Sequence, residues 1–323
     1  MLIFSHPACL LHNPGAAHPE QPQRLVAVIE SLRGEFQQQL QWQDAPLATD
    51  ETLLLAHDAS LISQLRLTEP SSGVSRLDAD TVMSPGSLEA SLRSTGAVCA
   101  AIDAVMQGSS SRAFCAVRPP GHHSTNSSAM GFCLFNQVAV GARYAQHAYR
   151  LDRVAIVDFD VHHCNGTQAI FEQDDSVLVV SSHQSPLYPG TGSTNERGAG
   201  NIVNGELAPG AGSQAFRELW KLRLLPAIDL FAPQLILISA GFDAHHLDPL
   251  ADLNLGASDY RWITLQLMGL AEKHANGRIV SSLEGGYSLT ALRKSSIAHV
   301  GALIDHRVDD LDGAITHLSA NMP

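Results

Sequence analysis

The sequence predicts an α/β fold, with a mainly parallel β-sheet flanked by helices on both faces, in a single domain spanning residues 1–323. Short apolar runs alternate along the chain with longer segments in which apolar residues recur every three or four positions. The short runs are apolar on both faces, which is typical of parallel strands covered on each side. The chain is 45% hydrophobic, enough for a large core, and no repeat or linker marks a domain boundary.

The expected elements alternate in chain order. The apolar, β-branched runs predict strands at 113–117, 153–157, 176–180, 234–238 and 278–283. The amphipathic period predicts helices at 86–107, 132–150, 212–230, 258–275 and 289–305. Pro85 and Gly108 bracket the first of these helices, and Gly131 precedes the second, as turn-forming residues often do.

Composition excludes several classes of function. The net charge of -12 argues against a nucleic-acid partner, because neutralising phosphates requires clustered Lys and Arg. The sequence contains neither a signal-peptide pattern nor an apolar run long enough to span a membrane, so we expect no membrane association. The five cysteines are scattered without a C-x-x-C pair, which favours a reducing compartment and therefore the cytoplasm. The sequence is compatible with a homo-oligomer.

Ionisable residues gather directly after the strand expected at 153–157. In open α/β sheets the ligand crevice lies beyond the carboxyl ends of the strands, where Asp158, Asp160 and His162 stand. If the chain stays extended through residue 162, all three side chains face the same side. Carboxylate oxygen and imidazole nitrogen suit zinc or a similar divalent ion, which needs about three protein ligands in a catalytic site.

Three further groups of residues follow neighbouring strands. Asp243 ends "QLILISAGFD" and is the candidate third ligand, although an Asp after a glycine also commonly caps a turn. "RPPGHHS" would hold His122 and His123 rigidly for acid-base catalysis, unless they form an exposed pair in a loop. In "LEGGYS", Tyr287 could donate its hydroxyl to a polarised carbonyl, or pack on the surface.

Taken in order, "RPPGHH", "GFCLFN", "DFDVHHCNGT", "PGTG", "SAGFDAH", "DPL" and "EGGY" closely resemble the zinc-dependent histone deacetylase family, in particular its class II-like bacterial amidohydrolases. The resemblance begins at "HPACLLHNPGAAHPEQPQRL" and covers nearly the whole chain. It implies the arginase/deacetylase fold and hydrolysis of the acetamide of N-acetyl-lysine in peptides or proteins to acetate and a free amine.

The resemblance also implies roles for individual residues. Asp160, His162 and Asp243 would bind zinc, with ferrous iron as an alternative metal. His123 would be the general base and acid, His122 paired with Asp158 would give electrostatic support, and Tyr287 would help to polarise the carbonyl. The family's acyl-lysine tunnel corresponds to Gly131, Phe132 and Tyr188. Its structural potassium ion corresponds to the backbone near Asp158, Asp160 and His162 and to Ser181.

Three positions subdivide the family. Cys164 replaces a glycine that most members carry. Asn165 matches the class II pattern and would leave His123 without an aspartate partner, which should lower its basicity. Leu250 stands where polyamine-selective relatives place a glutamate, so the resemblance favours acyl-lysine over an acetylated small amine.

Three alternatives remain at this stage: an amidohydrolase of acetylpolyamines or other small acyl amides, a binuclear manganese ureohydrolase, and a non-catalytic module that binds acylated ligands. A binuclear site needs additional bridging carboxylates. The non-catalytic module should have lost a ligand, a catalytic histidine or the tyrosine.

Overall fold

The computed structural model describes residues 1–304 and confirms the parallel α/β architecture. Eight strands form one sheet in the order β2-β1-β5-β10-β9-β6-β7-β8, and every neighbouring pair is parallel. The strands are β1 (Leu2–Ser5), β2 (Gln41–Asp44), β5 (Arg112–Cys115), β6 (Val154–Asp158), β7 (Val177–Gln184), β8 (Ile202–Leu207), β9 (Leu235–Ala240) and β10 (Ile279–Leu283). Two short strands, β3 (Ser75–Arg76) and β4 (Val82–Met83), pair antiparallel outside this sheet.

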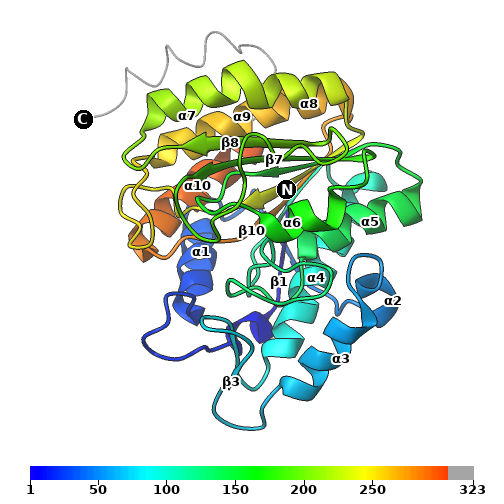
Figure 1. The fold of residues 1–323 in the computed structure, drawn as a ribbon, viewed down its shortest axis with the longest axis vertical. Helices are drawn as coiled ribbons and strands as arrows, with labels where there is room; N and C mark the ends of the chain where they lie inside the picture. Colours follow the sequence, from blue (N-terminus) through cyan, green and yellow to red (C-terminus); the bar gives the residue numbers. More distant parts are fainter. Residues whose placement is uncertain (305–323) are drawn as a thin grey trace.

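Helices cover both faces of the sheet (Figure 1). They are α1 (Pro22–Glu35), α2 (Asp50–Leu53), α3 (Ala59–Thr68), α4 (Ser87–Met106), α5 (Gln137–Tyr149), α6 (Asn165–Phe171), α7 (Ser213–Leu219), α8 (Leu225–Phe231), α9 (Ala257–His274) and α10 (Leu289–Ile304), with a 3-10 turn η1 (Pro7–Leu10) and a π turn η2 (Trp220–Leu224). One layer contains α1, α10, α9 and α8, while α4 and α5 pack together on the other face.

All five strands predicted from sequence are present, within a few residues at each end, but β1, β2, β8 and the short pair β3 and β4 were not predicted. Within the large sheet, the missed strands are β2 and β8, at its two edges, and β1, next to β2. β2 reads "QWQD" and is largely exposed, and β8 contains Asn204 and Gly205. Edge strands need no continuous apolar run, because one side of their ladder is not covered by another strand.

Two predicted helices differ in detail from the structure. The helix expected at 132–150 begins only at Gln137, because Phe132 has a positive φ of 68° and the side chain of Asn136 caps the helix by accepting from the Ala139 N–H. The helix expected at 212–230 is continuous but passes through the π turn η2. The last helix was expected to reach residue 305, which lies outside the described residues.

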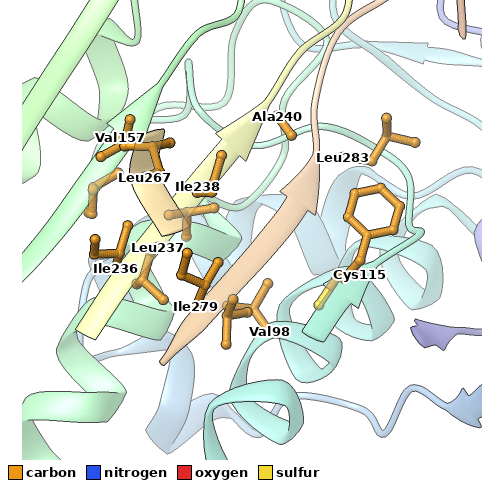
Figure 2. Close-up of a cluster of buried hydrophobic side chains, with 14 of the residues drawn as sticks. Val98, Cys115, Val157, Ile236, Leu237, Ile238, Ala240, Leu267, Ile279 and Leu283 are labelled. Carbon is orange, nitrogen blue, oxygen red and sulfur yellow. The ribbon is translucent and has the colours of Figure 1, made fainter. Parts of the chain in front are cut away.

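The core between sheet and helices fixes the register of the central strands. Figure 2 shows side chains of β6, β9 and β10, including Val157, Ile238 and Leu283, packed into one buried cluster. Parallel pairing in this register places Asp158 beside Ser239 on one neighbouring strand and Ser181 on the other. The carboxyl ends of β6, β9 and β10 are therefore held level with one another at the same edge of the sheet.

Within residues 1–304, no helix combines the length and the apolar character that crossing a membrane requires.

Candidate active site and metal centre

Asp160, His162 and Asp243 converge at the carboxyl ends of β6 and β9. The Nδ1 atom of His162 lies 3.0 Å from Asp160 Oδ1 and 3.2 Å from Asp243 Oδ2. One potential ligand atom from each of the three residues lies within 4.8 Å of the other two, and all three side chains are buried. Asp243 does not merely cap its own turn, since its Oδ1 accepts a hydrogen bond from the Val161 N–H at 2.8 Å, across to the end of β6.

The chain is not extended through residue 162, and this part of the sequence prediction was wrong. β6 ends at Asp158, whose Oδ1 accepts from the Asp160 N–H at 2.9 Å. The Oδ1 atom of Asp160 then accepts from the His162 N–H at 3.0 Å. An Asp side chain readily bonds to the backbone two residues on and so bends the chain. These consecutive bends still bring Asp160 and His162 together, while the Oδ2 atom of Asp158 points to His122.

The donor set fits a tetrahedral metal ion. Zinc bound at about 2.0–2.1 Å by nitrogen and oxygen has neighbouring ligand atoms roughly 3.3 Å apart, close to the two distances at His162 Nδ1. Burial opposes a positive charge on His162, but the hydrogen bonds to Asp160 and Asp243 and the charges of these carboxylates raise the pKa of His162 to about 10. Burial and the neighbouring Asp160 raise the pKa of Asp243 to about 7. Such a pocket attracts a cation, and a metal ion would replace the proton on His162.

Two glycines allow the carboxylates to sit where they do. A Cβ on Gly241 would lie 1.9 Å from Asp160 Oδ2, and a Cβ on Gly285 would lie 2.1 Å from Asp243 Oδ2. The Gly285 N–H also donates to Asp160 Oδ2 at 2.8 Å. Because any side chain at either position would displace a carboxylate, these glycines belong to the centre. Gly241 lies within "SAGFDAH" and Gly285 within "EGGY", but the sequence reasoning gave neither glycine a role beside the carboxylates.

The two histidines of the 118–124 loop lie beside this centre and are buried, so they are not an exposed pair. Their ring centroids are 4.0 Å apart, and the His123 centroid is 5.9 Å from that of His162. The Nδ1 atom of His122 lies 3.0 Å from Asp158 Oδ2, and that of His123 lies 2.7 Å from Asn165 Oδ1. One histidine therefore has a carboxylate partner and the other an amide partner.

These partners give the histidines opposite acid-base character. Burial favours the neutral form of His122, but the charges of Asp160 and Asp158 prevail and raise its pKa to about 10. Burial, followed by the charges of His122 and His162, lowers the pKa of His123 well below the ordinary range. At neutral pH, His122 is the cationic member of the pair and His123 is the neutral one, with the capacity to accept a proton.

Aromatic side chains enclose the histidine pair. The Tyr188 ring meets His123 edge to face at 5.1 Å, and the Phe132 ring meets Tyr287 at 5.9 Å. Tyr188 is 38% exposed, so this wall lies near the solvent. Gly131 is required behind it, because a Cβ there would lie 2.5 Å from the His123 ring. Gly131, Phe132 and Tyr188 thus come together around the two predicted catalytic groups, His123 and Tyr287.

Tyr287 is held by charged groups that the sequence reasoning did not identify. The guanidinium of Arg24 lies 4.8 Å above its ring and bonds to the carbonyl oxygens of Glu284 and Gly286, both at 2.5 Å. The carboxylate of Asp248 accepts from the Tyr287 N–H at 2.7 Å. The Leu250 N–H donates to the other oxygen of Asp248 at 3.1 Å, which links the position expected at the pocket mouth to the tyrosine loop.

A buried ion-pair network continues beneath Arg24. The carboxylate of Glu20 bonds to both Arg24 and Arg118, and all three side chains are fully buried. These cations, with His12, hold the pKa of Glu20 well below its usual range, even though burial alone would raise it. The sequence signals were the "HPEQPQR" segment, which holds Glu20 and Arg24, and "RPPGHH", which begins at Arg118, because burial of an isolated charged residue is not visible in composition.

Two further predicted positions lie on β7 and before α6. Ser181 is buried, is the register partner of Asp158, and has its Oγ 2.9 Å from His183 Nδ1. Cys164 is also buried, and burial, followed by the charge of Asp158, raises the pKa of its thiol well above the ordinary range. Cys164 therefore stays a neutral thiol and packs as a small apolar side chain in the core cluster.

Comparisons with known proteins show which family the chain is similar to. The model of the histone deacetylase domain matches residues 18–303. A histone deacetylase-like amidohydrolase of Pseudomonas aeruginosa is 41% identical over 278 residues, covering 84% of this chain and 72% of that protein. Type-2 histone deacetylase 2 of Dictyostelium discoideum is 35% identical over 96% of this chain, which spans only 21% of that protein. The crystal structure of the HDA15 HD domain superimposes with a TM-score of 0.88 at 34% identity, covering 94% of this chain and 89% of that one.

Proposed function

The chain belongs to the histone deacetylase family, and we propose that it is a zinc-dependent deacetylase that releases acetate from N-acetyl-lysine in peptides or proteins. We place this activity in one catalytic domain over residues 1–323, acting in the cytoplasm. The main support for the proposal is that three side chains suited to bind a metal ion, those of Asp160, His162 and Asp243, converge at one point. Beside them lie a cationic histidine, His122, and a neutral one, His123.

The residues of the chain would divide the reaction among them. A zinc ion held by Asp160, His162 and Asp243 would activate water and polarise the amide carbonyl. His123 would accept the proton of the attacking water, because its low pKa keeps it neutral and Asn165 orients its ring. His122, as a cation, would stabilise the negative charge that develops beside it during the reaction. The Tyr287 hydroxyl would donate a hydrogen bond to the developing oxyanion, and a histidine would return a proton to the leaving amine.

Two finer features also belong to the proposal. We assign the acyl chain of the substrate to the wall formed by Gly131, Phe132 and Tyr188, whose rings lie beside His123 and Tyr287. We assign a structural potassium ion to the backbone near Asp158, Asp160 and His162 together with Ser181. The supporting observation is that Asp158 and Ser181 are register partners on adjacent buried strands.

The second candidate is an amidohydrolase of acetylated polyamines, which would use the same machinery. Leu250 argues against it, because an apolar side chain at that position offers no charge to a second ammonium group. A matched panel tests the choice: acetate release by zinc-loaded protein from acetyl-lysine peptides and from N-acetylated polyamines, with and without a hydroxamate. We expect peptide hydrolysis that hydroxamate blocks. A preference for polyamines would overturn the substrate assignment, and no turnover of either would overturn the proposed function.

A further inference from the structure

Glu284, which follows β10 directly, is a buried carboxylate with no role in the reaction proposed above. Its Oε2 atom accepts from the backbone N–H groups of Gly121 at 2.7 Å and His122 at 3.2 Å. Its Oε1 atom accepts from the Gln137 side-chain amide at 3.0 Å. One side chain therefore joins the end of β10 to the catalytic histidine loop and to the first residue of α5.

We propose that Glu284 is a positioning residue, which fixes the backbone of the histidine loop, and through it His122 and His123, by accepting these three hydrogen bonds. The inference rests on the proposed function and adds to it a residue that is neither a proposed metal ligand nor part of the proposed substrate wall. Its effect is geometric. The peptide groups of residues 121 and 122 determine the positions of the Cα atoms from which the two histidine side chains extend, and these positions set the distance of 4.0 Å between the ring centroids of His122 and His123.

The packing around Glu284 leaves the loop little freedom to adjust. A Cβ on Gly121 would lie 1.8 Å from the Gln137 Oε1 atom, so the loop backbone presses directly on that amide. From the other side, the Thr167 N–H donates to the His122 carbonyl at 3.2 Å. The backbone of Glu284 is itself fixed, because its N–H donates to Ala240 O at 3.0 Å and its carbonyl accepts from Arg24.

Two other roles for this carboxylate make different predictions. Its charge could stabilise the His122 imidazolium, in which case charge matters more than reach. Alternatively, His122, Cys133 and Glu284 could bind a second metal ion, since one ligand atom of each lies within 4.8 Å of the others. Both carboxylate oxygens already accept hydrogen bonds, and His122 Nδ1 already faces Asp158, which favours the positioning role.

The side-chain amide of Gln137 allows the positioning role of Glu284 to be tested by substitution. Among the described residues, its Oε1 atom is buried without a hydrogen-bond partner. In a Glu284→Gln variant, the new amide oxygen can still accept from the loop, and a flipped Gln137 can accept from the new NH₂ group through Oε1. In Glu284→Asp the carboxyl group is kept, but it is withdrawn by one methylene and cannot reach the loop. The two variants therefore separate hydrogen-bond geometry from charge.

The experiment compares wild type, Glu284→Gln, Glu284→Asp and an exposed control, Glu30→Asp, by steady-state acetate release, zinc content and amide hydrogen exchange at residues 118–124. We expect Glu284→Asp to lower kcat about a hundredfold, the cost of misplacing a catalytic group by about 1 Å, with KM within about threefold. It should bind one zinc per chain and exchange faster at Gly121 and His122. Glu284→Gln should lose only about threefold in kcat and keep its protection.

The reverse order, with Glu284→Asp more active than Glu284→Gln, would overturn the positioning role in favour of charge. A second zinc per wild-type chain that disappears in both variants would overturn it in favour of a metal site. Unchanged exchange and turnover in Glu284→Asp would overturn it outright. If wild type itself hydrolyses no acetyl-lysine peptide, the proposed function fails instead, and the exchange measurement still decides whether Glu284 holds the loop.

Discussion

The floor of the site and its wall are built in different ways. The floor consists of buried side chains at the ends of β6 and β9, and its carboxylates are fixed by backbone N–H groups and by glycines that leave no room for movement. The wall and rim consist of loop residues such as Tyr188, which is 38% exposed, and Leu250, which is only partly buried. We infer that the buried groups beyond the strand ends determine the chemistry and that the more exposed loop residues determine which substrate reaches them.

The floor should tolerate no change to its ligands. Asp243→Ala removes one of the three proposed ligand groups and leaves the Val161 N–H without its acceptor. We expect zinc content to fall below stoichiometric and acetate release to fall by at least about a thousandfold, since metal activation contributes several kcal/mol. Metal analysis and turnover check this, with the exposed Asp175→Ala as the control. Full activity in Asp243→Ala would remove this residue from the centre.

Loss of the His123 side chain should lower turnover but leave the zinc content unchanged. His123→Ala leaves Asp160, His162 and Asp243 in place, so we expect one zinc per chain. The rate should fall by roughly 10²–10⁴-fold, the usual contribution of general acid-base catalysis. The same two assays distinguish this variant from Asp243→Ala. Loss of zinc from His123→Ala would mean that His123 supports the centre rather than acting as the base.

The partner of His123 should set the pH profile. In the wild type, the low pKa of His123 places the acid limb of kcat/KM below pH 6.5, because activity is lost only when this base becomes protonated. Asn165→Asp puts a carboxylate beside Nδ1, which favours the imidazolium, raises the pKa and moves the acid limb to higher pH by about one unit or more. Rate profiles of this variant and of the exposed control Asn276→Asp check the shift. A limb that stays in place or moves to lower pH would exclude His123 as the titrating base.

The rim should show the smallest effects. Leu250→Glu adds a carboxylate at the predicted pocket mouth without touching the floor. Because a partly exposed ion pair contributes about 0.2–1 kcal/mol, we expect kcat/KM for acetylpolyamines to rise by at most about fivefold relative to acetyl-lysine peptides. Competition between the two substrates in one reaction measures this ratio. An unchanged ratio would show that residue 250 does not contact the distal end of the substrate.

The sequence predicted the centre of the sheet and the floor of the site better than their surroundings. The buried strands have continuous apolar runs, and parallel strand ends must meet at one edge, so Asp160 and Asp243 could be brought together by reasoning alone. The supports of the floor were not predicted. Gly285, Arg24 and Glu284 act through contacts between segments far apart in sequence, and no local pattern distinguishes a buried Arg or Glu from an exposed one.

The bends at 158–162 were missed for a related reason. An Asp is compatible with either an extended strand or a bend, and here hydrogen bonds from its own neighbouring backbone decide in favour of bends. The late start of α5 has a similar origin, because the side chain of Asn136 caps the helix and the chain before it turns through a positive φ at Phe132.

The most direct test of the account is to titrate metal-free protein with zinc while measuring acetate release from an acetyl-lysine peptide. One triad with the histidine pair beside it predicts that activity rises in proportion to added zinc and reaches its maximum at one zinc per chain. A requirement for a second equivalent would point to a binuclear centre, and hydrolysis that does not depend on metal would contradict the assignment of Asp160, His162 and Asp243 altogether.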